Sequence, residues 1–167
     1  MSVRAHPAAT IPEWMVGGFA PTIDRVDIAV DPAIADEDLR TYLPYLVAHE
    51  LHHVARRRGP GYGRTLRDAI VTEGLADHFA LELLGGSPPP WSVALTRADL
   101  TALTALAAKD NSGSGYDHQG WFFGRPPQIP RWTGYAIGFE VVGDFIERNQ
   151  MTASQLTDTP TDQIWAP

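Results

Sequence analysis

Cysteine is absent from this chain of 167 residues, which excludes a disulfide framework and any metal site built on thiolates. A transition metal would therefore have to be held by histidine and carboxylate side chains. The chain has six histidines, so the search for a metal site concentrates on these residues.

Long apolar runs are also absent. The N-terminal segment, residues 1–12, contains Arg4 and His6 and lacks the continuous apolar stretch of a signal peptide. No later segment reaches the length that a membrane-spanning helix needs. We therefore expect a cytoplasmic location without a membrane partner. With a hydrophobic content of 44%, the sequence predicts a single domain over residues 1–167.

Positive charge is scarce, since 13 Lys and Arg face 20 Asp and Glu and give a formal net charge of -7. Nucleic acids and anionic lipids bind to basic faces that release their counterions, so this composition argues against both as partners. One basic cluster, residues 56–58 with Arg64 and Arg67, lies at a predicted helix end. A solvated surface that interacts favourably with the helix dipole is the preferred interpretation, over an anion-binding site.

Hydrophobic patterning predicts a mainly helical α+β fold with a small N-terminal sheet. Residues 25–31 alternate between apolar and polar in the manner of a half-buried strand. Periodicity and capping signals predict four helices and a short fifth one that opens at Thr152. Pro44 is expected to kink or split the first helix. The four predicted helices cover residues 36–58, 65–83, 96–109 and 135–148.

The sequence from His49 to His53 lies inside the first predicted helix and matches the pattern H-E-x-x-H. Residues four apart project from one helix face, so His49 and His53 can hold the same metal ion. Glu50 lies beside that ion, at the place of a general base for metal-bound water. His52 is disfavoured as a ligand and is interpreted as a residue behind the ligands or at the surface.

The chain after the motif predicts a third ligand. If the first two helices pack antiparallel, eight residues from Thr65 bring the chain to Glu73, level with His53. Asp77, one turn further, arrives level with His49 and could accept its second ring N–H. Two nitrogens and one carboxylate leave a fourth position open, as in catalytic zinc sites. Ligand type and abundance favour one Zn²⁺ per chain.

Such a site predicts a zinc-dependent hydrolase. Zinc lowers the pKa of its bound water towards about 7, Glu50 takes the proton, and the resulting hydroxide attacks a carbonyl. A peptide bond is the favoured substrate, although the same chemistry would cleave a non-peptide amide or ester. A non-catalytic metal-containing binding module is an alternative of a different class, and it would not need Glu50.

The spacing from His49 to Asp77 resembles that of the gluzincin metallopeptidases, and the nineteen residues between His53 and Glu73 match thermolysin. A wider pattern, over about residues 15 to 157, is similar to a bacterial family of predicted zinc-dependent proteases. The resemblance implies a zincin-like domain, peptide-bond hydrolysis and a peptide or protein substrate. The pattern consists of Gly17-Gly18-Phe19, the strand around Ile28, Ala48 to His53, Glu73-Gly-Leu-Ala-Asp77 and Gly134-Tyr-Ala-Ile-Gly138.

Gluzincins usually place a Tyr or His opposite the base to stabilise the oxyanion. Tyr135 is the best candidate here, with a core tyrosine as the other interpretation. The large C-terminal domain of thermolysin has no counterpart in this sequence. Substrate is therefore expected to contact residues 110–134, a Gly-, Pro- and aromatic-rich segment without periodicity, and the edge of the strand from Val26 to Val30.

Several residues keep more than one interpretation. His118, beside Asp117, is a candidate for substrate contact, whereas His78 and Glu82 are interpreted as solvated helix residues. The aromatic residues of the 110–134 segment either line a hydrophobic specificity pocket or anchor a long loop to the core. These residues are Trp121, Phe122, Phe123 and Trp132.

Overall fold

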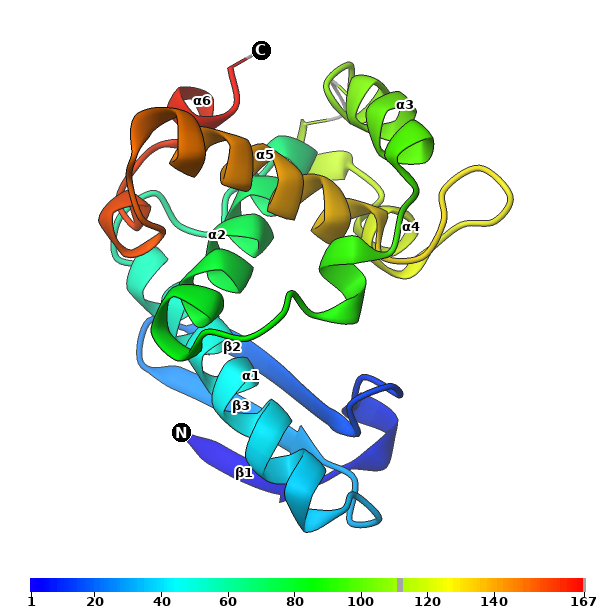
Figure 1. Cartoon of the computed structure of the whole chain (residues 1–167), viewed down its shortest axis with the longest axis vertical. Helices are drawn as coiled ribbons and strands as arrows, with labels where there is room; N and C mark the ends of the chain where they lie inside the picture. Colours follow the sequence, from blue (N-terminus) through cyan, green and yellow to red (C-terminus); the bar gives the residue numbers. More distant parts are fainter. Residues whose placement is uncertain (111–112, 167) are drawn as a thin grey trace.

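The computed structural model describes residues 1–110 and 113–166, and its strands form one small sheet near the N-terminus (Figure 1). The strands are β1 (Ser2–Ala5), β2 (Val16–Thr22) and β3 (Arg25–Val30), in the order β1-β3-β2. β3 is parallel to β1 and antiparallel to β2. The strand predicted at residues 25–31 is therefore confirmed.

The prediction that the edge of this strand receives a substrate is wrong, because β3 lies in the middle of the sheet and both its sides are paired. β1 occupies one side of it, with Val3 opposite Ile28. β1 has only four residues and all of them are exposed. Its sequence therefore lacks the alternation of buried apolar and exposed polar residues by which a strand can be predicted. β2 is the sheet edge that lies against α1.

Helices make up most of the remaining structure, and the α+β, mainly helical class is confirmed (Figure 1). A kink or a split was expected at Pro44, and α1 is not split there, because it is continuous from Asp36 to Arg56. α4 lies in the segment that was expected to be irregular, of which residues 111–112 are outside the described chain. The helices are α1 (Asp36–Arg56), α2 (Leu66–Leu84), α3 (Arg97–Ala107), α4 (His118–Phe123), α5 (Thr133–Asn149) and α6 (Thr161–Ile164); one-turn 3-10 helices lie at Pro7–Ala9, Pro90–Val93, Gly113–Gly115 and Ser154–Leu156.

Local signals fix the ends of α2, the helix that carries Glu73 and Asp77. The Thr65 side chain accepts a hydrogen bond from the backbone N–H of Asp68, and the Asp68 carboxylate accepts one from the N–H of Thr65. This capping box satisfies two otherwise unpaired helix N–H groups. Gly85 follows the last turn with a φ of 69°, a backbone conformation that glycine adopts without strain.

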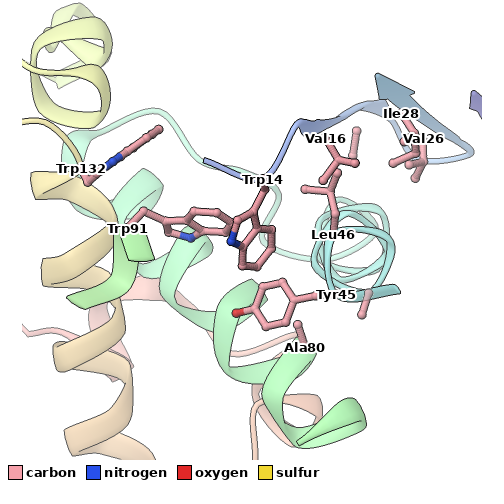
Figure 2. Close-up of a cluster of buried hydrophobic side chains, with 11 residues drawn as sticks. Trp14, Val16, Val26, Ile28, Tyr45, Leu46, Ala80, Trp91 and Trp132 are labelled. Atoms are coloured by element: carbon pink, nitrogen blue, oxygen red, sulfur yellow. The ribbon is translucent and has the colours of Figure 1, made fainter. Parts of the chain in front are cut away.

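The core places α1 between the sheet and α2 (Figure 1). Leu46 of α1 points toward Val16 of β2, while Tyr45 packs edge-on against Trp14 at a ring distance of 5.3 Å (Figure 2). Trp14 also contacts Trp91, with ring centroids 4.5 Å apart. This cluster joins the sheet and α1 to the Pro90–Val93 turn, whose side chains reach the candidate site.

α2 and α5 approach so closely that their backbones touch. A Cβ atom at Gly74 would lie 2.1 Å from the carbonyl oxygen of Gly138, and one at Gly138 would lie 2.2 Å from the carbonyl oxygen of Ile70. Neither position has room for a side chain. The contact explains why both the Glu73-Gly74 and the Gly134 to Gly138 parts of the sequence pattern contain glycine.

Arg56 corrects the interpretation of the basic cluster as solvated, because it is only 1% exposed. Its Nε donates to Thr72 Oγ1 at 3.2 Å, and its Nη1 donates to the carbonyl oxygens of Thr157 and Thr159 at 3.0 and 2.9 Å. Burial of a guanidinium is tolerated where acceptors replace its water. Arg56 thus ties the end of α1 to α2 and to the C-terminal segment, while Arg58 is exposed.

Across residues 1–110 and 113–166, no helix has both the length and the apolar character needed to cross a membrane.

Candidate metal centre

Three ligand-type atoms from α1 and α2 converge on one point. His49 Nε2 and His53 Nε2 are 3.0 Å apart, and Glu73 Oε2 is 3.0 Å from the first and 3.4 Å from the second. All three side chains are buried. Within the described part of the chain, this is the one group of three such residues whose ligand atoms all lie within 4.8 Å of one another.

The geometry of this group fits a zinc ion. A tetrahedral zinc with ligand distances of about 2.0–2.1 Å has neighbouring ligand atoms about 3.3 Å apart, close to the three separations observed. Two imidazoles and a carboxylate are also the donor set that suits zinc when thiolates are absent. The residues present therefore fit the cation that the sequence predicts.

Asp77 fixes the proton on the other side of the His49 ring. Its Oδ1 lies 2.7 Å from His49 Nδ1, and its Oδ2 accepts hydrogen bonds from Trp91 Nε1 at 3.0 Å and Ser92 Oγ at 2.5 Å. With Nδ1–H donating to the carboxylate, the lone pair of Nε2 faces the metal position. Burial of the His49 ring opposes its protonation, but the hydrogen bonds and charges of Asp77 and Glu73 together outweigh burial and raise the pKa of His49 well above its usual value.

Tyr62 holds the second oxygen of Glu73, since its hydroxyl donates to Glu73 Oε1 at 2.6 Å. It stands between Gly61 and Gly63, whose φ values of 81° and 91° let the connection between α1 and α2 turn over the site. Burial opposes ionisation of Glu73, but the charges and hydrogen bonds of His53 and His49 outweigh burial and hold the pKa of Glu73 well below its usual value.

Sequence reasoning missed Tyr62, Trp91 and Ser92. Tyr62 sits in a turn that was interpreted only as the end of a helix, although a tyrosine flanked by glycines beside a metal motif is a signal that could have drawn attention. Trp91 and Ser92 follow a run of three prolines and have no periodic pattern. Their role depends on the fold bringing residues 91 and 92 against Asp77.

Glu50 is 5% exposed and lies beside the two histidines, as predicted. Its Oε2 is buried and has no hydrogen-bond partner among the described residues. Burial raises the pKa of Glu50, while the nearby His53 and His49 lower it. An unpaired buried carboxylate oxygen is costly in a structural site but is suited to proton transfer.

Gly18 of the edge strand β2 makes room for Glu50. A Cβ atom at position 18 would lie 2.6 Å from both Cγ and Oε1 of Glu50. This close approach limits where the carboxylate can lie, and it explains why position 18 is a glycine.

Two cavities meet at the centre and share Gly18, Phe123 and Tyr135. The first, of about 380 Å³, is lined mostly by apolar and aromatic residues together with His49 and Arg131, while the second, of about 390 Å³, contains most of the charged groups. Walls of the first include Ile11, Leu46, His49, Trp91 and Trp132. Walls of the second include Glu50, His53, Arg57, Tyr62, Glu73 and His118.

The predicted aromatic residues divide between the two interpretations. Trp121 and Phe122 are buried in the core beneath α5 and anchor the segment, whereas Phe123 and Trp132 line the first cavity. Phe122 packs edge-on against Tyr135 at a ring distance of 5.0 Å. The described part of the 110–134 segment is therefore both an anchor and a cavity wall.

Tyr135 and His118 face the polar cavity as possible hydrogen-bond donors. Burial raises the pKa of Tyr135, and the charges of Glu73, Asp77 and Glu50 raise it further, so the hydroxyl keeps its proton. His118 Nδ1 lies 3.0 Å from the Tyr116 hydroxyl. Burial lowers the pKa of His118, so its ring is neutral near pH 7.

His52 and His78 are not part of the group that could hold a metal. His52 is 1% exposed and packs against Phe79 at a ring distance of 5.4 Å, and burial lowers the pKa of His52 to about 3. His78 is not the solvated residue that was expected, because it is half-buried against Phe139 and its Nε2 lies 2.8 Å from the Phe139 carbonyl oxygen. Glu82 is exposed, as expected.

Comparison with known proteins agrees with this geometry. A family model described as Predicted Zn-dependent protease (DUF2268) matches residues 8–166. Two uncharacterized proteins of Bacillus subtilis (strain 168), YjfC and YjaZ, are 27% identical over 129 residues and 28% identical over 124 residues. These alignments cover 69% and 70% of this chain but 43% and 47% of the relatives, so the chain spans less than half of their length. No solved structure matches the chain. The chain belongs to this family of predicted Zn-dependent proteases.

Proposed function

We propose that the chain is a zinc-dependent hydrolase that cleaves peptide bonds. The convergence of His49 Nε2, His53 Nε2 and Glu73 Oε2, with the unpaired carboxylate of Glu50 beside them, carries the proposal. Three protein ligands leave room for a reacting group, which a closed structural site does not.

Bound zinc supplies a Lewis acid that makes water more acidic and polarises a carbonyl group. Glu50 then accepts the proton of the attacking water and returns it to the leaving amine, since its free oxygen is not held by the protein. Asp77 keeps the Nδ1 proton of His49 in place. Tyr62 holds the orientation of Glu73 through the hydrogen bond to Oε1.

Tyr135 is proposed to donate its hydroxyl to the carbonyl oxygen of the substrate as negative charge develops there. Its place at the junction of both cavities supports this role, because the scissile bond has to lie at that junction. His118 is the second candidate, but it lines only the polar cavity.

The edge strand β2 favours a peptide over other amides and esters. Gly17 lines the first cavity, Phe19 lines the second, and Gly18 between them lines both. An extended peptide can pair with the backbone of such an edge, whereas an ester without peptide groups cannot.

The first experiment is metal removal. Zinc content would be measured by mass spectrometry, and cleavage of a quenched-peptide library would be followed before chelation, after chelation and after zinc is returned. We expect one zinc per chain, loss of cleavage with the metal and recovery on its return. Zinc with hydrolysis of esters only would favour the non-peptide alternative. Zinc without any turnover would favour a binding module.

Changing Gly18 to alanine is expected to displace the Glu50 carboxylate and lower kcat/KM by about 100-fold, because misplacement of a reacting group by about 1 Å costs that much. Zinc content should stay at the wild-type level, since the three ligands lie on other elements. Gly115→Ala is the matched control, because a Cβ there meets nothing within 4 Å. Equal loss of activity in both variants would show that Gly18 has no particular effect on Glu50.

A further inference from the structure

The polar cavity contains the cationic side chain of Arg57, which forms no ion pair with any of the described residues. Arg57 follows the last residue of α1 and lines this cavity together with Glu50 and His53. Its Nε is buried and has no hydrogen-bond partner among the described residues. Its guanidinium carbon lies 5.8 Å from the centre of the Tyr62 ring. The preceding Arg56, by contrast, donates three hydrogen bonds.

Arg57 is half-buried and its Nε has no acceptor, which is unfavourable and leaves the guanidinium available to an anion that enters the cavity. Glu50 lies close enough for the charge of Arg57 to oppose the burial that raises the pKa of Glu50, but no ion pair or hydrogen bond joins the two side chains in the described chain. The planar guanidinium matches a carboxylate, which it can bind through two parallel hydrogen bonds.

We infer, on the basis of the proposed function, that Arg57 binds a substrate carboxylate on one side of the scissile bond, while the aromatic cavity takes a large apolar side chain on the other. Arg57 stands four residues after His53, about 6 Å along the helix axis. An extended peptide advances about 3.3 Å per residue, so this carboxylate lies one or two residues from the cleaved carbonyl. It comes either from the C-terminus or from an Asp or Glu side chain.

The part of α1 just before His49 provides the apolar side. Leu46 lies three residues before His49 on the same helix face and lines the aromatic cavity with Trp91 and Trp132. The volume of this cavity, about 380 Å³, is large enough for an aromatic side chain. The two cavities thus divide the substrate into an apolar part and an anionic part, on either side of the metal centre.

The test measures binding, which does not require turnover. Zinc-loaded Glu50→Gln protein would be titrated with acetyl-Ala-Phe-Ala as the free acid and as the amide. A second pair, acetyl-Phe-Glu-amide and acetyl-Phe-Gln-amide, separates a side-chain carboxylate from a C-terminal one. We expect the preferred acid to bind about 10- to 100-fold more tightly than its uncharged partner.

Adding Arg57→Gln should remove this preference and leave binding of the uncharged peptide and the zinc content unchanged. Arg58→Gln, the exposed neighbour, is the control and should keep the preference. Equal binding within both pairs, no binding of any of them, or an equal loss for acid and amide in Arg57→Gln would overturn the inference. An equal loss for acid and amide would mean that Arg57 maintains the structure of the cavity and does not bind the carboxylate. Cleavage by the wild type decides the proposed function separately.

Discussion

Glu50→Gln is expected to reduce kcat/KM for peptide hydrolysis by about 10²–10⁴-fold while one zinc per chain remains bound, because general acid–base catalysis contributes a factor of this size. Glutamine keeps the shape of the side chain in its tight place against Gly18 but cannot accept a proton. Zinc content by mass spectrometry and steady-state kinetics on the same preparation test this.

Glu37→Gln provides the control, since Glu37 is exposed in the first turn of the same helix. It removes one negative charge from α1 without touching the site, and it should retain wild-type activity. A Glu50→Gln protein that cleaves peptides at the wild-type rate would assign the general base to another residue.

Glu73→Ala is expected to abolish stoichiometric zinc binding, because it removes one of three ligands and leaves two buried imidazoles facing each other. Activity should be lost with the metal. The residues behind the ligands should give smaller effects, with Asp77→Asn and Tyr62→Phe each weakening zinc affinity by about 10- to 100-fold. Competition with a chromophoric chelator would measure all three.

Thermal unfolding in the presence of excess chelator is the control for this series, because it reports the stability of the metal-free fold. If Glu73→Ala kept one zinc per chain, the ligand set would have to be different. If Tyr62→Phe had no effect on affinity, the hydrogen bond to Glu73 would serve the fold instead.

The ligand residues could be predicted because their geometry is local. A helix repeats every 3.6 residues, so His49 and His53 share a face whatever surrounds them. Glu73 follows by a short connection on the next helix, and the structure brings it to within 3.4 Å of His53. The capping box of Thr65 and Asp68 is local in the same sense.

The remaining features depend on contacts between distant parts of the chain. The alternation within one strand does not determine the order of the strands, so the central position of β3 and the edge position of β2 could not be derived from it. Arg56 looked like its solvated neighbours until the carbonyl groups of residues 157 and 159 supplied its acceptors. The roles of Gly18 and Tyr62 likewise depend on contacts that form only in the folded chain, with Glu50 and Glu73 respectively.

The backbone contact between Gly74 and Gly138 restricts which residues of the site can change in sequence among relatives. Glu73 precedes one of these glycines, and Tyr135 lies three residues before the other, so main-chain atoms rather than adjustable side chains set the spacing between their helices. Relatives that cleave different peptides would have to diverge in the walls of the two cavities. Phe123 and Arg57, which line the cavities and belong to neither α2 nor α5, are the positions where we expect such divergence.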